Sequence, residues 1–484
     1  MFKILCRKET YVYNAYHIGK AFYPSETVEA SVEEKASHYV ILFLPSGKRL
    51  ELDQEEQERF LDRKTQKHLM DQRLYRVLSA ETGRTLAWGI LTGVRPTKLA
   101  MGKLEEGMER QDFLSWFTGE YLVSRKKAEV SWDIVRREKE LLDRLDYQDG
   151  YSLYVGIPFC PTVCTYCSFS SGSLDQWGNF VEPYLEALRR ELEFIGSASD
   201  GKKLNTIYFG GGTPTSLNED QLERLLSWID EIFPRDHLLE YTVEAGRPDS
   251  ITKEKLRVIR SHGVTRISIN PQSMQQKTLD RIGRRHQVEE ILSAYHMARE
   301  EGFDNINMDV IAGLPGERLA DMEDTLAKLE ALGPDSLTVH SLAVKRAAKM
   351  GQDGYVPGRE SQDAGPAEIS AMLEAAEKSA GRMGMTPYYL YRQKNIAGNF
   401  ENTGYAKVDK AGIYNILIME EKQSIIAAGA GASTKLVFKE PVVNPEGKKQ
   451  KKTNLIRLEN VKAIDAYIRR VREMIERKGE WLWR

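Results

Sequence analysis

The sequence predicts an α/β protein built around a partial (β/α)6 barrel, with six strands where a complete TIM barrel has eight. Between residues 149 and 345, six short apolar runs alternate with segments of helical period. Serial β–α units place parallel strands in one sheet through right-handed crossovers. In such folds the chemistry gathers at the carboxyl ends of the strands, and the unusual residues of this region directly follow the apolar runs.

The elements of this central region can be placed from their apolar patterns. We expect helices over residues 183–196, 219–233 and 288–302, among others. We expect the six strands over residues 151–158, 205–212, 239–245, 266–272, 305–314 and 336–344.

Residues 1–148 are predicted to form an α+β domain with a helical connector. Alternating, tyrosine-rich segments, TYVYNAYHI and HYVILFLPSGKRLELD, predict strands. Helical patterns follow over residues 68–83, 90–104 and 123–146. Within the second pattern, Thr92–Lys98 has a glycine and a proline where a helix should begin, so it is either a tight turn or a contact with the next domain.

Residues 346–484 are expected to form an α+β extension. The pattern predicts a loop, a helix over 366–383, an aromatic strand over 387–394 and a glycine-rich stretch over 427–434. A hairpin over 435–460 and a terminal helix follow, and the run KKQKK is expected at the solvated tip of that hairpin.

Composition excludes several classes of protein. The 484 residues include 69 basic and 71 acidic side chains, so no charge excess favours nucleic acid or an anionic membrane. Four cysteines do not make a disulfide framework, and no apolar stretch approaches the ~18 residues of a membrane span. We therefore expect a cytoplasmic protein with no membrane span and no nucleic-acid partner.

Three of the four cysteines lie together in CPTVCTYC, directly after the first central strand. Thiolates select zinc, copper(I) or iron–sulfur clusters. A structural zinc site needs four ligands, and a two-cysteine redox motif would leave Cys160 unexplained. Cys160, Cys164 and Cys167 best suit a [4Fe–4S] cluster with one iron free of protein ligands, while zinc and chance grouping remain as alternatives.

The spacing of these cysteines, with Tyr166 before the last one, resembles the signature of the radical S-adenosylmethionine (SAM) enzymes. The resemblance implies that the free iron binds the amino and carboxylate groups of SAM. An electron from the cluster would then break the sulfonium bond and give a 5′-deoxyadenosyl radical. Residues 149–345 would be the radical SAM core, and residues 346–484 would cover the substrate.

Residues at the later strand ends extend the resemblance. It implies that Gly210-Gly211-Gly212-Thr213-Pro214 accepts the SAM ammonium group, and that Arg284 pairs with the SAM carboxylate. Each polar residue alone could equally cap a loop, but their order along successive strands favours a cofactor site. The other residues implied in cofactor binding are Tyr154 and Tyr166, Glu244 and Gln272 at the SAM amino or ribose groups, Asp309 at the ribose hydroxyls, and Gly313-Leu314-Pro315 near the adenine.

Within that superfamily, YVGIPFCPTVCTYC, GGGTPTSL, GLPGE and the run from Tyr391 to Thr434, with Asn415, resemble the oxygen-independent coproporphyrinogen III oxidase family. LTGVRPTKL, EAGRPDS and PYYLYRQKNIAGNFEN are most similar to its HemZ coproporphyrinogen dehydrogenase branch. Two positions depart from the oxidase pattern. Phe169 stands where the oxidase has a further cysteine, and Arg247, beside Glu244, has no secure counterpart but could contact a carboxylate.

The resemblance implies an oxidoreductase of haem biosynthesis. It would decarboxylate two propionates of coproporphyrinogen III to vinyl groups, giving protoporphyrinogen IX, with an unidentified electron donor and acceptor. The alternatives are a haem-binding chaperone of the same family, or a methyltransferase or other radical SAM enzyme that modifies tetrapyrroles. Candidates to hold the macrocycle, each of which could also be an ordinary surface or core residue, are Lys345, Arg346, Tyr389, Tyr391 and Arg392.

Overall fold

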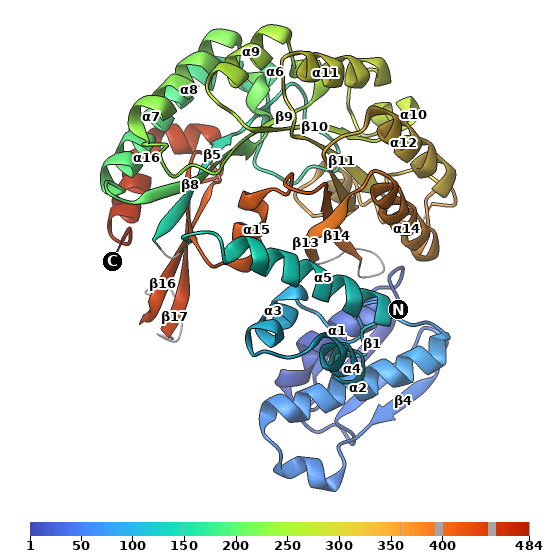
Figure 1. The fold of residues 1–484 in the computed structure, drawn as a ribbon. Coiled ribbons are helices and arrows are strands. Elements are labelled where there is room, and N and C mark those ends of the chain that lie inside the picture. Colours follow the sequence, from blue (N-terminus) through green and yellow to red (C-terminus); the bar gives the residue numbers. More distant parts are fainter. Residues whose placement is uncertain (148, 359, 393–399, 444–451, 484) are drawn as a thin grey trace.

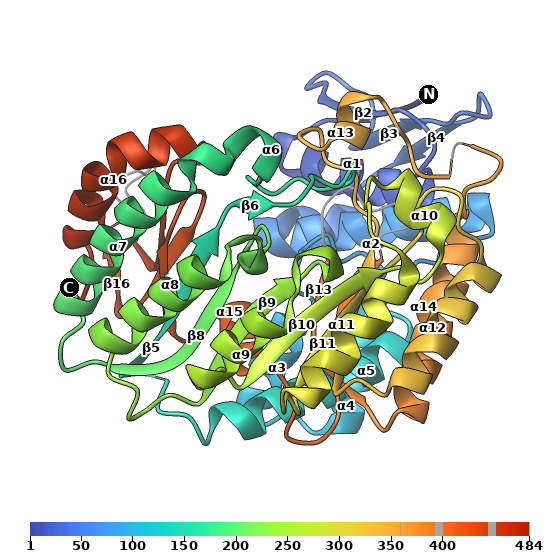
Figure 2. The same cartoon turned by 90° about the horizontal axis from the view of Figure 1, so that it is seen from above.

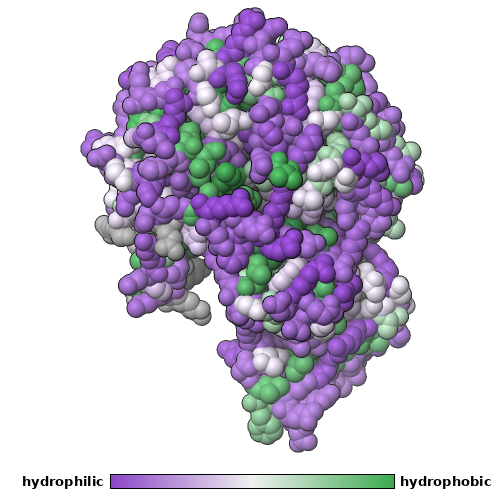
Figure 3. All heavy atoms as spheres, in the orientation of Figure 1, coloured by the Kyte–Doolittle hydropathy of each residue, from purple (hydrophilic) through white to green (hydrophobic). Residues whose placement is uncertain are grey.

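A computed structural model describes residues 1–484 except 148, 359, 393–399, 444–451 and 484. One large curved sheet, covered by helices on its outer side, forms the body, and the N-terminal segments lie against it below the connector helix α5 (Arg125–Leu142) (Figure 1). Hydrophilic side chains dominate the face seen in Figure 3. Within the described residues, no helix has the length and apolar character needed to cross a bilayer.

The body is an eleven-stranded sheet in the order β13-β14-β12-β11-β10-β9-β8-β5-β15-β16-β17. The six predicted strands form its centre and run parallel to one another. Among the described residues the two edge strands, β13 and β17, do not pair with each other, so the barrel is open. The predicted α/β class is confirmed. The central strands are β5 (Gly150–Ile157), β8 (Lys203–Gly211), β9 (Glu240–Gly246), β10 (Arg266–Gln272), β11 (Ile306–Ala312) and β12 (Ser336–Ser341).

Amphipathic helices between these strands cover the outer face of the sheet (Figure 2). In α8, for example, five apolar side chains at helical spacing are buried, and Asn218 caps the first turn. The three helices predicted here are present. The helices of this layer and its loops are α6 (Leu174–Trp177), α7 (Val181–Ala198), α8 (Glu219–Ile232), α9 (Lys253–Ser261), α10 (Gln276–Arg281), α11 (Val288–Glu300), α12 (Leu319–Leu332), α13 (Lys349–Gln352) and α14 (Pro366–Arg382).

The C-terminal region extends the sheet at both edges. Beyond β12, β14 (Glu401–Ala406) and β13 (Thr386–Arg392) add antiparallel strands. Beyond β5, β15 (Ser424–Ala428) adds a seventh parallel strand that the sequence analysis did not predict. The predicted hairpin is formed by β16 (Ser433–Val443) and β17 (Lys452–Glu459), but most of the KKQKK run lies outside the described residues.

The N-terminal region has its own four-stranded sheet and hydrophobic core. The prediction of a strand over TYVYNAYHI is wrong, because this segment lies in α1 (Glu9–Phe22). Tyr11, Ala15, Ile18 and Phe22 are buried at helical spacing, and this period outweighs the alternating tyrosines. The other elements here are β1 (Phe2–Cys6), β2 (Val28–Val32), β3 (Val40–Phe43), β4 (Arg49–Leu52) and α2 (Arg63–Thr82), before α3 (Thr97–Glu105) and α4 (Arg110–Tyr121) of the connector.

The segment Thr92–Lys98 forms a contact, and it does so with the C-terminal region. The backbone N–H of Arg392 donates to the Val94 carbonyl at 2.7 Å. The Arg95 guanidinium donates to the Glu421 carboxylate at 2.5 Å and also to the Met419 carbonyl. Arg95 thus holds the end of α15 (Ile413–Glu420), a short helix that lies over the central sheet.

A buried carboxylate ties three distant parts of the chain together. Glu191 on α7 and Lys478 on the terminal helix α16 (Ile464–Gly479) form an ion pair of 2.6 Å with side chains 0% and 1% exposed. Glu191 also accepts from the Gly429 N–H at 2.8 Å and from Tyr467 at 2.5 Å. Every oxygen of the carboxylate is thereby satisfied, as burial of a charge requires.

We predict that Glu191→Gln lowers the free energy of unfolding by about 3–5 kcal/mol, because the Lys478 ammonium would remain buried without its counter-charge. A matched control is Glu193→Gln on the same helix, which removes an exposed ion pair to Arg189 and should cost no more than about 1 kcal/mol. Chemical denaturation of both variants measures the difference. Equal losses of stability would contradict the role given to the buried pair.

Candidate functional site

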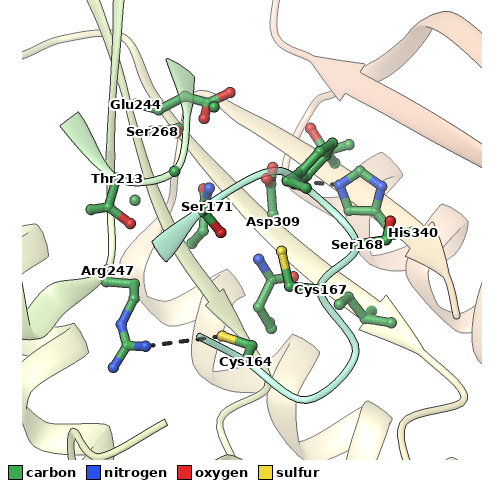
Figure 4. A pocket seen from close by; sticks show the side chains of 18 of the residues that line it. Cys164, Cys167, Ser168, Ser171, Thr213, Glu244, Arg247, Ser268, Asp309 and His340 are labelled. Atoms are coloured by element: carbon green, nitrogen blue, oxygen red, sulfur yellow. Dashed lines mark hydrogen bonds and ion pairs between the residues drawn. The ribbon is translucent and has the colours of Figure 1, made fainter. Parts of the chain in front are cut away.

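A cavity of about 440 Å³ opens at the carboxyl ends of the central strands. Side chains from separate strands and loops face this common space (Figure 4). The cavity brings together twelve of the residues predicted for the cluster and the cofactor. They are Tyr154, Cys160, Cys164, Tyr166, Cys167, Gly211, Gly212, Thr213, Glu244, Gln272, Arg284 and Asp309.

Cys160 ends the short strand β6 (Phe159–Cys160), and Cys164 and Cys167 lie on the loop from there to β7 (Gly172–Ser173). All three are free thiols, and Cys160 and Cys164 are buried. Backbone bonds fix the middle of the loop on both sides: the N–H of Thr165 donates to the Ile282 carbonyl at 3.0 Å, and its carbonyl accepts from Met350 at 2.9 Å. The loop is therefore held in place by the protein itself.

Three soft thiol donors on the rim of one cavity fit an iron–sulfur cluster. Among the described side chains, no three histidine, cysteine or acidic groups are arranged around a single metal ion. A four-iron cluster binds each thiolate through a different iron atom, so it does not require the three sulfurs to converge on one point.

The glycine turn after β8 packs directly on the strand that leads to the cysteines. The N–H groups of Gly212 and Thr213 donate to the carbonyls of Ile157 and Phe159, each at 2.7 Å. A Cβ atom on Gly212 would lie 2.6 Å from the Phe159 oxygen, which only a backbone shift could relieve. Gly211 has φ +107°, so glycine is required here for conformation as well as space.

Glu244 lies at the end of β9 under this turn. The Tyr208 hydroxyl donates to its carboxylate at 2.5 Å. Burial, together with the nearby Asp309 carboxylate, raises the pKa of Glu244 to about 7, against the lowering effects of Tyr208 and His340. The carboxyl therefore changes charge near neutral pH, inside the cavity.

Gln272 and Arg284 leave buried polar atoms unsatisfied. Gln272 has φ +64°, a strained conformation for a residue other than glycine, and its Oε1 has no partner among the described residues. Arg284 donates to the Asn270 carbonyl at 2.5 Å, yet its Nε also lacks a described partner. Buried polar groups are normally paired, so these atoms indicate a polar ligand in the cavity.

Asp309 lies in the middle of β11 (Ile306–Ala312), and not at its end as predicted, and it is held as a carboxylate. Burial alone would raise the pKa of Asp309, but the neighbouring His340 ring and a hydrogen bond from Asn307 lower it below its usual value. The Asn307 amide donates at 2.7 Å, and the His340 ring lies 3.7 Å from the other oxygen. His340 was not among the predicted residues, although it belongs to the sixth strand and the same strand-end argument could have identified it.

The remaining candidates separate into two groups. Lys345, Tyr389 and Tyr391 line the cavity, whereas Arg346 does not. Arg392 as a substrate ligand is wrong: its guanidinium donates to the Leu91 carbonyl at 2.7 Å, behind the sheet. Gly210, Pro214 and Gly313-Leu314-Pro315, which were predicted to contact SAM, do not line the cavity either.

The helix α15 was not predicted from the sequence. Its residues Tyr414 and Asn415 also line the cavity. The Tyr414 ring stacks on Tyr208 with centroids 4.4 Å apart. The carboxylate of Glu240 accepts from the N–H groups of Ile413 and Tyr414 at 2.6 and 3.3 Å and so fixes the start of this helix. Nothing in the local pattern indicates a contact over this distance in sequence.

Comparison with known proteins agrees with this geometry. The radical SAM superfamily model matches residues 154–329. The HemZ oxygen-independent coproporphyrinogen-III oxidase-like protein of Bacillus subtilis is 45% identical over 368 residues, which is 75% of this chain and 72% of that protein. The haem chaperone HemW of Bacillus subtilis is 37% identical, over 40% of this chain and 51% of its own length.

Among solved structures, coproporphyrinogen III oxidase (HemN) from Escherichia coli, a radical SAM enzyme, superposes with a TM-score of 0.52. It is 22% identical and the match covers 70% of this chain and 73% of HemN, so it supports the fold. The cofactors of the superfamily are a [4Fe–4S] cluster and SAM. The chain belongs to the family of oxygen-independent coproporphyrinogen-III oxidase-like proteins within the radical SAM superfamily.

Proposed function

We propose that this protein oxidatively decarboxylates two propionate side chains of coproporphyrinogen III to vinyl groups, giving protoporphyrinogen IX. Each reaction removes one hydrogen atom, releases CO2 and passes one electron to an acceptor. The observation that carries the proposal is the convergence of twelve predicted residues on one cavity in a chain similar to HemZ over 75% of its length. We further propose that the protein acts in the cytoplasm.

The residues around the cavity form two groups, one that would bind the cofactors and one that would bind the substrate. Cys160, Cys164 and Cys167 would hold the cluster, while Arg284 and Asp309 would orient SAM through its carboxylate and ribose. When bound, these cofactors supply the radical that takes a hydrogen atom from the propionate β-carbon. The protein's own contribution is to position the groups and to exclude water.

The wall opposite the cysteines suits a flat anionic macrocycle. Tyr389 and Tyr391 stack with centroids 6.3 Å apart and present aromatic surface. Lys345, exposed at the rim, is available to a propionate. A cavity of about 440 Å³ is of ordinary ligand size, so we propose that a tetrapyrrole enters with one propionate foremost and extends over this rim.

A second candidate function is haem binding without turnover. Phe169 is 72% exposed on the cysteine loop, and an exposed aromatic side chain there could stack on a haem. The HemW chaperone of Bacillus subtilis matches 40% of this chain. The similarity to HemZ covers 75% of the chain, which favours the oxidase-like reaction.

The test is anaerobic turnover of the cluster-loaded protein with SAM, a low-potential one-electron reductant, an electron acceptor and coproporphyrinogen III. We expect vinyl products and 5′-deoxyadenosine that forms only when the porphyrinogen is present. SAM cleavage without vinyl products would overturn the substrate. Stoichiometric haem binding with no turnover would support the chaperone instead, and methylated or ring-opened products would indicate another tetrapyrrole chemistry.

Replacement of one proposed cluster ligand should abolish the reaction. We predict that Cys164→Ala loses most bound iron and all formation of 5′-deoxyadenosine, because two thiolates no longer anchor the cluster. Cys6→Ala is the matched control, since Cys6 is buried in the N-terminal core away from the cavity. Iron analysis and product chromatography measure both. Full iron in the Cys164 variant would contradict the assignment.

We expect the Glu244 carboxylate to lower the stability of the fold while it strengthens the binding of SAM. Folding raises the pKa of Glu244 from 4.5 to about 7, so the folded state holds the proton more tightly than the unfolded state. The protein therefore loses stability as the pH rises from about 4.5 to 7. We predict that Glu244→Gln melts at a higher temperature than the parent at pH 8, with the gap closing near pH 5. The same variant should bind SAM more weakly at pH 8, measured by anaerobic calorimetry. A variant that melts lower at pH 8 and binds SAM normally would refute this role.

A further inference from the structure

Arg247 lies directly behind the cysteine loop. Its side chain is buried, with an exposed fraction of 2% for the residue. Nη1 donates to the carbonyl and hydroxyl of Thr162 at 2.8 and 2.6 Å and lies 4.0 Å from the Sγ atom of Cys164 (Figure 4). Arg247 lines the cavity, and its guanidinium is directed at the sulfur atom of Cys164.

A second set of contacts fixes this orientation. Nε and Nη2 of Arg247 form a two-pronged ion pair with Asp249 at 3.0 and 2.6 Å. The buried ring of His286 lies 3.6 Å from the same carboxylate. The pair is thus a dipole whose positive end faces Cys164 and whose negative end faces away from it, and its planar fork leaves the arginine little freedom to turn.

We propose that Arg247 is a positioning residue that raises the reduction potential of the cluster by presenting positive charge to Cys164. The proposal rests on the proposed role of the three cysteines as cluster ligands. Reduction adds one electron, supplied by a one-electron donor, to a centre that three thiolates already make negative. Buried positive charge and N–H donors near a ligating sulfur stabilise the reduced form, and low solvent access leaves this effect poorly screened.

Arg247 lies in a tight turn after β9, where Gly246 has φ +66° and Arg247 precedes a short 3-10 helix. The turn directs Arg247 back under the loop. A role in holding the loop alone would not require the charge to lie beside Cys164.

The test is an EPR-monitored redox titration of the full-length, cluster-loaded protein without SAM or tetrapyrrole. In Arg247→Met, we expect the ratio of reduced to oxidised cluster at a fixed solution potential to fall about tenfold, which for one electron is about 59 mV. Asp249→Asn removes the compensating negative charge and should shift the potential in the opposite direction. Arg285→Met, which removes an exposed neighbouring arginine, is the control and should leave the potential unchanged.

The iron content of each variant distinguishes a change in reduction potential from loss of the cluster. If Arg247→Met retains full iron and its midpoint equals that of the parent, the proposal is overturned. If Arg247→Met fails to hold the cluster, Asp249→Asn decides the matter, because it keeps the arginine: a more positive midpoint supports the proposal and an unchanged midpoint contradicts it. Since no substrate is present, failure of the proposed decarboxylation would leave this measurement unaffected.

Discussion

The site depends on the common direction of the central strands. Because β5, β8, β9, β10 and β11 are parallel, their carboxyl ends open on the same edge of the sheet. Residues up to 155 positions apart, from Tyr154 to Asp309, are thereby brought to one cavity. An antiparallel sheet with the same residues would divide them between two edges.

The strand ends are fixed in turn by contacts from the C-terminal region. Tyr184 on α7 donates to the carbonyl of Gly156, just before the cysteine loop, and accepts from the N–H of Ala430. Glu191 on the same helix binds the adjacent Gly429 N–H, so the seventh parallel strand and the terminal helix are locked beside β5. At the other side of the cavity, Glu240 and Arg95 hold the two ends of α15. Residues distant in sequence thus close the site around the core.

Much of the core was predictable because its signals are local. The apolar runs were enough to predict the six central strands. The resemblance to radical SAM enzymes then identified twelve residues that line one cavity. The errors have physical causes. The tyrosine alternation in TYVYNAYHI concealed a helical period, and β15 pairs with a strand more than 250 residues earlier, which no local pattern reveals. Arg392 carries a suitable charge but is directed by its backbone bond to Val94 toward the connector.

The central claim is that Cys160, Cys164 and Cys167 hold a cluster with one iron open to SAM. The most direct measurement is the iron content of the anaerobically purified protein, combined with the EPR spectrum of its reduced form before and after addition of SAM. The account predicts about four iron atoms per chain and a spectrum that changes on addition of SAM. A spectrum indifferent to SAM, or a protein that holds zinc in place of iron, would contradict it.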